Sequence, residues 1–336
     1  MKNWSGGPKR ETIPPGAAMS GVIEVHGLRK EYRRLRGGTT VAVDGLDLSV
    51  PEGGVFGFLG PNGAGKTTTI RCLLGLVRPT SGDCRLMGAD SQRGLHSVIG
   101  RVGSIVETPA LFPRFSGRRN LRLLARLDGI GRKRVDEALE RVGLAARANH
   151  PVKTYSLGMK QRLGIAAALL KDPAVLILDE PANGLDPAGI VEVRELLRTL
   201  GAEGRTVFVS SHQLAEVQTV CDQVAILSRG RAVAFGPVTD VLASSRSRGL
   251  IVRLDDLPAG LAALAEAGFE AAMDAGAIRV DLRPGEGARV SEALARRGLF
   301  VSELRPEEVS LETVFLELTQ DQPPDRPPEP AAEGSP

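Results

Sequence analysis

Cysteine is scarce in this sequence, and long apolar runs are missing from it. The 336 residues include three cysteines, Cys72, Cys84 and Cys221, which are scattered and show no metal-ligand spacing. A disulfide framework is therefore not expected, and a reducing compartment is favoured. A membrane-spanning helix needs about 20 largely apolar residues. The longest apolar stretches, such as residues 165–170, have only the length of buried core segments, so no spanning segment is predicted.

An excess of charge of one sign is also missing. The chain has 43 Lys and Arg against 40 Asp and Glu, a formal net charge of +3. So small an excess does not predict nucleic acid as the main partner. With 42% hydrophobic and 25% charged residues, the composition is that of an ordinary globular protein, long enough for one large and one small domain.

The two ends of the chain differ from the rest in composition. Residues 1–20 are rich in glycine, proline and charge, and they lack the apolar core of a signal peptide. We predict a disordered N-terminal extension there. Residues 320–336 combine prolines with acidic residues, which predicts a disordered, solvated acidic tail.

Two patterns lie between these ends. Residues 21–242 alternate short apolar runs, such as 55–59 and 175–178, with helical patterns. Such runs suit strands buried on both faces, so an α/β domain with a mainly parallel sheet is expected. Residues 248–319 instead follow the order β-α-β-β-α-β, with the last strand expected at 299–304. This order predicts a small α+β, ferredoxin-like domain.

A glycine-rich loop follows the strand expected at 55–59. Its spacing is G-x-x-x-x-G-K-[ST], in which glycines let successive backbone N–H groups face one phosphate at a helix N-terminus. Lys66 supplies a point charge for the β- and γ-phosphates, and the Thr67 hydroxyl can bind Mg²⁺. The predicted triphosphate-binding residues are Gly60, Pro61, Asn62, Gly63, Ala64, Gly65, Lys66, Thr67 and Thr68.

A second candidate site lies where the apolar run 175–178 ends in Asp179 and Glu180. A strand buried on both faces brings its last residue to the carboxyl edge of the sheet, where ligands bind in open α/β folds. Asp179 suits Mg²⁺, directly or through water. Glu180, one residue further, suits orienting the attacking water. Together with the glycine-rich loop, this pair predicts nucleotide hydrolysis.

The stretch Tyr155-Ser-Leu-Gly-Met-Lys-Gln-Arg162 lies between these two sites. It resembles the signature motif, usually written LSGGQ, of the ATP-binding subunits of ABC transporters. Physically it is a second anion site, in which Ser156 and Gly158 stand at a helix N-terminus. In that family the motif meets the γ-phosphate held by another subunit. The resemblance therefore implies a homodimer that encloses ATP between two copies of the chain.

Further motifs of that family occur in order. Tyr32 matches the aromatic residue that stacks on adenine, Asp186 matches the aspartate at the dimer seam, and His212 matches the histidine that contacts the γ-phosphate. The resemblance implies an ATPase with ATP and Mg²⁺ as cofactors, and with Glu180 and His212 as its catalytic residues. It also implies the P-loop ABC-type fold, including an antiparallel β part and a helical subdomain at about residues 108–165.

Two departures from the family pattern stand out. Glu107 occupies a position where the family usually has Gln, and its carboxylate is a candidate Mg²⁺ ligand. Met159 and Lys160 replace the usual Gly and Gln. Both departures resemble the branch associated with bacterial drug and peptide-antibiotic export and self-resistance. That branch implies a partner, an integral membrane permease, and a cytoplasmic position on the inner face of the membrane. The exported molecule cannot be read from this chain.

Two other classes of nucleotide hydrolase share the phosphate-binding motif. A soluble ABC ATPase that drives a nucleic-acid or ribosome-associated machine remains the main alternative. Repair ATPases of that kind insert long coiled coils between the two phosphate motifs, and Lys66 and Asp179 are too close in sequence to enclose one. A GTPase would need an N-K-x-D motif, which is not found. The arginines of residues 114–126 form either a solvated face or, in the part that faces the membrane subunit in the family, a surface that contacts it. The C-terminal domain has three candidate roles. It is a regulatory ligand sensor, a brace of the dimer, or a clamp on nucleotide-bound dimers.

Overall fold

The computed structural model describes most of the chain between the two expected disordered ends. Both ends, residues 1–20 and 320–336, lie outside the described residues. No helix among the described residues is long and apolar enough to cross a membrane. The described residues form two compact units, one ending at Val238 and the other beginning at Thr239. The described ranges are 21–33, 37–107, 109–245, 249–274, 276–282, 286–307 and 310–319.

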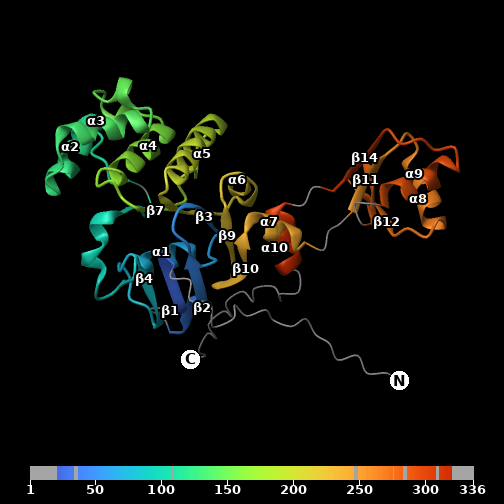
Figure 1. The fold of residues 1–336 in the computed structure, drawn as a ribbon, viewed down its shortest axis with the longest axis horizontal. Helices are drawn as coiled ribbons and strands as arrows, with labels where there is room; N and C mark the ends of the chain where they lie inside the picture. The colour runs from blue at the N-terminus through green and yellow to red at the C-terminus, as the bar shows by residue number, and fades with distance from the viewer. Residues whose placement is uncertain are drawn as a thin grey trace, which may run out of the picture. The chain divides into compact units, whose positions relative to one another are not determined.

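A six-stranded sheet forms the centre of the first unit (Figure 1). All neighbouring strands run parallel except β9 and β10, which pair as an antiparallel hairpin. The carboxyl ends of β3, β7 and β8 therefore meet at one edge, as the buried apolar runs predict. In spatial order the strands are β10 (Arg231–Pro237), β9 (Gln223–Ser228), β3 (Gly54–Leu59), β8 (Thr206–Ser211), β7 (Val175–Asp179) and β6 (Val102–Ile105).

An antiparallel sheet packs against the central one through a shared core. Ile23 and Leu46 of the antiparallel sheet, Phe56 and Phe208 of the central sheet, and Ile70 of α1 belong to one buried cluster. All three cysteines are buried and form no disulfide, as expected. The remaining elements here are β2 (Thr39–Val50), β1 (Ile23–Arg33), β4 (Ser81–Leu86), β5 (Ala89–Asp90) and α1 (Lys66–Leu73).

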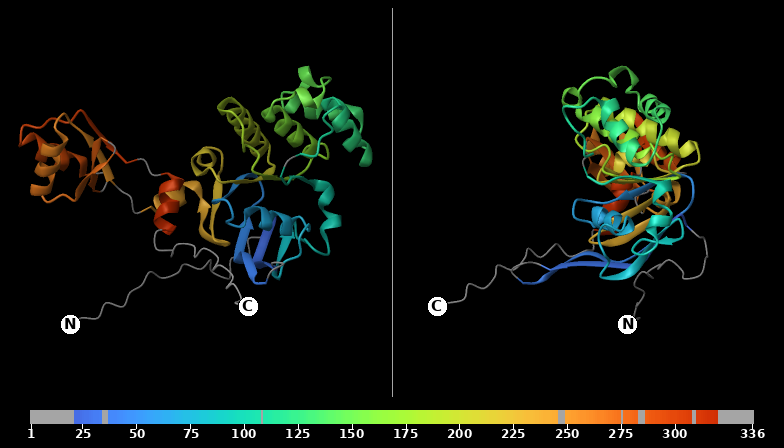
Figure 2. Two further views of the ribbon diagram at one scale, coloured as in Figure 1. Left: turned by 180° about the vertical axis from the view of Figure 1, so that it is seen from behind. Right: turned by 90° about the vertical axis from the view of Figure 1, so that its left-hand side faces the viewer.

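Three helices gather on one side of the two sheets, as Figures 1 and 2 show from several directions. Ser116 begins the first of them, and its hydroxyl accepts a hydrogen bond from the Arg119 N–H at 3.2 Å. These helices are α2 (Gly117–Leu127), α3 (Arg132–Arg141) and α4 (Leu157–Ala168). The remaining helices of the first unit are α5 (Pro187–Ala202) and α6 (Leu214–Gln218). Helix α7 (Val238–Ala243) begins at the last residue of the first unit and otherwise belongs to the second.

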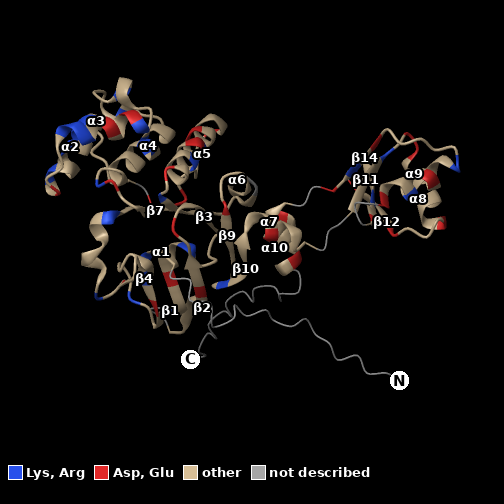
Figure 3. Cartoon of the chain, viewed as in Figure 1, with Lys and Arg blue, Asp and Glu red and all other residues tan. Residues whose placement is uncertain are grey.

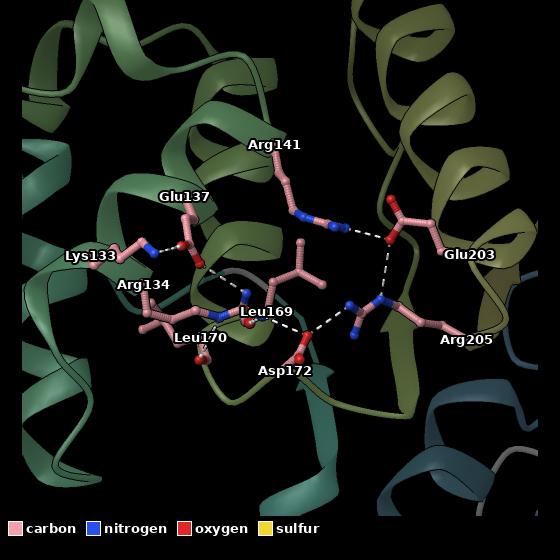
Figure 4. Close-up of polar contacts among 9 residues, drawn as sticks. All are labelled: Lys133, Arg134, Glu137, Arg141, Leu169, Leu170, Asp172, Glu203 and Arg205. Carbon is pink, nitrogen blue, oxygen red and sulfur yellow. Dashed lines mark hydrogen bonds and ion pairs between the residues drawn. The ribbon is translucent and has the colours of Figure 1, made fainter.

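Ion pairs join this helical group to the central sheet (Figure 4). Asp172 accepts a hydrogen bond from Arg134 of α3 and another from Arg205, next to the start of β8, both at 2.7 Å. Arg134 also donates to the Leu169 carbonyl at 3.0 Å, and Arg141 pairs with Glu203 at 2.5 Å. The hydrogen bond from Arg205, with Arg134 beside it, holds the pKa of Asp172 below its ordinary value.

We expect Asp172→Asn to lower the free energy of unfolding near neutral pH by about 1 kcal/mol, since pairs this exposed are rarely worth more. The folded-state pKa is lowered, so this stability is present above the ordinary carboxyl pKa and is lost as the pH falls through the lowered one. Urea unfolding of the full chain from about pH 7 to about pH 3 should show the difference shrinking. Glu140→Gln, at an exposed position of α3, is the control and should unfold like the wild type.

After α7, the second unit has the element order β-α-β-β-α-β, followed by a final helix. Its sheet has the order β12-β13-β11-β14, with every pair antiparallel, over a core that includes Leu264 and Leu294. The expected last strand, 299–304, is wrong at its start, because Leu299 N–H still caps the preceding helix and Leu299 packs into the core. The elements are β11 (Gly249–Arg253), α8 (Leu257–Glu266), β12 (Ala271–Asp274), β13 (Ala277–Asp281), α9 (Gly287–Ala295), β14 (Glu303–Pro306) and α10 (Leu311–Thr319).

Candidate active site

The glycine-rich loop connects β3 to α1, as its sequence predicts. Gly65 precedes the first residue of α1 with a φ of 105°, and a Cβ there would stand 2.5 Å from the Ala42 carbonyl oxygen. Only glycine fits this backbone and this close approach. The loop is held at its base by a hydrogen bond from the Gly60 N–H to the Ser211 carbonyl at 3.2 Å. The loop therefore presents backbone N–H groups at the start of a helix, which is the arrangement that binds phosphate.

Lys66 joins this loop to the end of β7. Its side chain is 5% exposed, and its Nζ donates to the Gly60 carbonyl at 2.7 Å. The same Nζ lies 3.1 Å from Glu180 Oε1, and Glu180 Oε2 lies 2.7 Å from His212 Nδ1. Lysine, glutamate and histidine thus form one chain of polar contacts across the carboxyl edge of the sheet. The structure brings together three of the residues that the sequence singles out, one at the start of α1 and the others just after β7 and β8.

Asp179 ends β7 beside the neighbouring strand β8. It is buried, and its Oδ1 accepts a hydrogen bond from the Ser210 hydroxyl. The Glu180 N–H donates to the same hydroxyl at 3.0 Å, so Ser210 fixes both acidic residues. The sequence alone does not single out Ser210 as a site residue. A polar residue near the end of a buried strand that lies next to β7 is the signal that could have found it.

The residues available for a magnesium ion are hard oxygen donors. Asp179 has one carboxylate oxygen that no described residue bonds, and Thr67 lies one residue into α1. Among the described residues, no group of three or more His, Cys, Asp and Glu could hold a metal by itself. Mg²⁺ commonly takes one or two protein ligands and completes its shell with phosphate oxygens and water. The donor set fits magnesium bound together with a nucleotide.

Glu107, the other candidate metal ligand, lies just after β6. Its backbone has a φ of 66°, and its carboxylate pairs with Arg71 of α1. The Glu107 side chain is 62% exposed. No hydrogen bond or ion pair among the described residues joins it to Thr67 or Asp179. The ion pair holds Glu107 against α1, the helix that follows the phosphate-binding loop.

Three further predicted site residues, Ser156, Gly158 and Asp186, have no hydrogen bond or ion pair with Lys66 or Glu180 in the described part of the chain. The Ser156 hydroxyl caps α4 by accepting from the Met159 N–H at 3.2 Å. Asp186 caps α5 in the same way, by accepting from the Gly189 N–H at 3.0 Å. Gly158 packs beside these residues, where a Cβ would lie 3.9 Å from the Gly189 Cα. In the described part of one chain, no hydrogen bond or ion pair connects this group to the phosphate loop.

Tyr32, the candidate adenine-stacking residue, lies near the end of β1 and is 38% exposed. The ammonium of Lys30 stands 5.0 Å from the centre of its ring. The ammonium therefore lies over one face of the ring as a cation–π contact, and the exposed ring is accessible to a stacking partner.

The fold and this edge of the sheet define a class of protein, the P-loop nucleotide hydrolases. The family model described as ABC transporter matches residues 43–183. The "Uncharacterized ABC transporter ATP-binding protein YhcH" of Bacillus subtilis (strain 168) is 40% identical over 303 residues, which cover 90% of this chain and 97% of that protein. The chain therefore belongs to the family of ABC transporter ATP-binding proteins. It binds ATP and is an ATPase.

Other relatives match over nearly their full length. The "Bacitracin transport ATP-binding protein BcrA" of Bacillus licheniformis is 40% identical, covering 89% of this chain and 98% of that one. The "Daunorubicin/doxorubicin resistance ATP-binding protein DrrA" of Streptomyces peucetius is 37% identical, covering 93% and 96%. Among solved structures, cbiO1 from Clostridium perfringens, part of an ABC transporter complex, is similar with a TM-score of 0.59 and 33% identity, over 67% of this chain and 92% of that one.

Proposed function

We propose that this ATPase powers a separately encoded membrane permease that exports a drug, an antibiotic or a peptide. The observation that carries the proposal is the near full-length similarity to proteins named for bacitracin transport and for daunorubicin resistance. The chain would then act in the cytoplasm, at the inner face of the membrane, held there by the permease.

Co-purification of the tagged chain from gently solubilised membranes, with and without ATP, tests this function. Recovery of a protein with several membrane spans and no ATPase motifs of its own is the expected result. Recovery of ribosomes, DNA or only soluble partners would leave the ATPase standing and overturn transport, in favour of a soluble ABC ATPase that drives a nucleic-acid machine.

The contacts among Lys66, Glu180 and His212 support the roles that we propose for the site residues. The loop backbone and Lys66 hold the β- and γ-phosphates, and Thr67 and Asp179 bind Mg²⁺, which offsets the charge of the phosphates. Glu180 orients the attacking water, and His212, 2.7 Å from it, contacts the γ-phosphate. This is catalysis by positioning and electrostatics, without a covalent intermediate.

A second copy of the chain is proposed to complete each site. Within one chain, Ser156 and Gly158 share no hydrogen bond or ion pair with the phosphate loop among the described residues, although both stand where α4 begins. Serine and glycine at a helix N-terminus suit a phosphate. A head-to-tail homodimer would bring this anion site of one copy to the γ-phosphate held by the other, with Asp186 and Tyr32 contacting the seam and the adenine. We place the ATPase domain at residues 21–242 and a separate domain at 248–319.

Glu107→Gln tests whether Glu107 contributes to the metal site. If its carboxylate faces Mg²⁺, directly or through water, the variant should need several-fold more Mg²⁺ for half-maximal ATP hydrolysis, because an amide is a weaker ligand for a hard cation than a carboxylate. Loss of the exposed ion pair with Arg71 should change the free energy of unfolding by less than about 1 kcal/mol. Magnesium titration of the ATPase rate measures the first effect. An unchanged magnesium requirement would contradict the role.

A further inference from the structure

Asp179 is a buried charge in a part of the central sheet that has no other. Within the described strands β3, β8, β7 and β6, it is the only charged residue, and Figure 3 shows these strands almost free of charged side chains. Asp179 is 4% exposed, and burying a charge is unfavourable unless hydrogen bonds or an ion compensate it. Among the described residues, the Ser210 hydroxyl is the one group that donates to its carboxylate. How that carboxylate is held therefore depends on Ser210.

The direction of this hydrogen bond follows from the neighbours of Ser210. The Glu180 N–H donates to the Ser210 hydroxyl oxygen at 3.0 Å. An N–H only donates and an ionised carboxylate only accepts, so the hydroxyl accepts from Glu180 and gives its proton to Asp179. Ser210 is fully buried, with β7 on one side of its strand and β3 on the other. The hydroxyl therefore has no contact with solvent, and water cannot readily take its place.

The hydrogen bond also determines which oxygen of Asp179 remains for a metal. Oδ1 accepts from the Ser210 hydroxyl, and Oδ2 has no partner among the described residues. Rotation about the Cβ–Cγ bond of an aspartate is only weakly restricted, so the hydroxyl fixes the plane of the carboxylate. Carboxylates that bind metals are themselves hydrogen-bonded, and loss of such a partner commonly lowers metal affinity by about 10- to 100-fold.

We propose that Ser210 is a positioning residue for the magnesium ion of this ATPase, because its hydroxyl keeps the second oxygen of Asp179 available to the metal. The inference rests on the proposed role of Asp179 as a metal ligand. The effect of the hydroxyl on Glu180 is smaller, since the Glu180 N–H also donates to the Ser210 carbonyl at 3.2 Å. That second bond belongs to the backbone and persists whatever the side chain. Ser210 thus acts on the metal ligand and leaves the proposed base in place.

Metal binding by Ser210→Ala tests this inference without measuring hydrolysis. The purified full chain is loaded with a non-hydrolysable ATP analogue and titrated with Mn²⁺, which accepts the same oxygen ligands as Mg²⁺ and loses its free-ion electron paramagnetic resonance signal on binding. Ser210→Ala should bind Mn²⁺ about tenfold more weakly than the wild type, or weaker still. Its affinity for a fluorescent ATP analogue in EDTA should stay within about twofold of the wild type, because the phosphate loop does not contact this hydroxyl. That second value reports a folded chain with an intact loop.

Thr206→Val is the matched control, because it removes a buried hydroxyl from the other end of β8, where that hydroxyl accepts from the Gly53 N–H at 2.8 Å. It should bind Mn²⁺ within about twofold of the wild type. Equal losses in Thr206→Val and Ser210→Ala would show a general effect on the strand and overturn the inference.

Asp179→Asn separates the inference from the proposed function on which it rests. We expect it to weaken Mn²⁺ binding at least as much as Ser210→Ala does. If Asp179→Asn weakens binding and Ser210→Ala does not, Asp179 remains a metal ligand and the positioning role of Ser210 is wrong. If Asp179→Asn binds Mn²⁺ like the wild type, Asp179 is not a ligand, and the metal assignment falls together with the inference.

Discussion

Glu180→Gln is expected to lower steady-state ATP hydrolysis by roughly 10²- to 10⁴-fold and to leave ATP binding intact. Glu180 follows the last residue of β7 and reaches both Lys66, at 3.1 Å, and His212, at 2.7 Å. Glutamine keeps the size of the side chain but cannot accept a proton from the attacking water. Phosphate release at saturating ATP measures the rate, and a fluorescent ATP analogue measures binding. If two copies enclose ATP, the variant should also accumulate as an ATP-dependent dimer in size-exclusion chromatography.

A matched substitution separates this effect from a general loss of negative charge. Glu195 lies on α5, is exposed, and pairs with Arg198 on the same helix. Glu195→Gln should hydrolyse ATP within about twofold of the wild type, since an exposed pair of this kind contributes little. Hydrolysis by Glu180→Gln at the wild-type rate would show that another group orients the water, and would remove Glu180 from the proposed mechanism.

The contacts of Lys66 link the phosphate-binding loop to Glu180. Lys66, Glu180 and His212 partly satisfy one another, because the carboxylate lies between the ammonium and the imidazole. Incoming phosphates compete for the Lys66 ammonium, which frees one oxygen of Glu180. An oxygen of Glu180 that Lys66 no longer contacts is available to a water molecule. ATP binding and the positioning of the base would thus be linked through one lysine.

The parts of this site that could be predicted are set by local sequence. The spacing of Gly60, Gly65 and Lys66 restricts the backbone between one strand and one helix, so the loop follows from its own residues. The buried run that ends at Asp179 likewise predicts the edge at which both acidic residues lie. The comparisons with known proteins confirm the family that these motifs predict.

What could not be predicted depends on which strands become neighbours. The hydrogen bond from Ser210 to Asp179 exists because β8 pairs with β7 in a register that places these residues opposite one another. No spacing along the chain encodes that pairing. The strand β2 is likewise not expected from the apolar runs, because its pairing with β1 contains register shifts and Gly45 has a φ of 71°. Such irregularities break the alternation of apolar and polar residues from which a strand is recognised.

Lys66→Met is expected to weaken ATP binding by about 30-fold or more, because removing one partner of a buried, hydrogen-bonded charge pair costs about 2–5 kcal/mol. Methionine keeps a long unbranched side chain in the space that Lys66 fills, so the change removes the ammonium and little else. Titration of a fluorescent ATP analogue, with and without Mg²⁺, measures the loss. Hydrolysis should fall below detection at the ATP concentration that saturates the wild type.

Lys171→Met is the control for this substitution, because Lys171 pairs with Asp128 at 3.0 Å outside the proposed site. It should bind ATP as the wild type does. Lys66→Met also distinguishes two roles for the contacts of Lys66 with the Gly60 carbonyl and Glu180. If Lys66 only stabilises the folded chain, by joining the Gly60 carbonyl to Glu180, Lys66→Met should lower the melting temperature while ATP affinity persists in the folded fraction. If Lys66 holds the phosphates, affinity is lost even where the circular dichroism spectrum shows the chain fully folded.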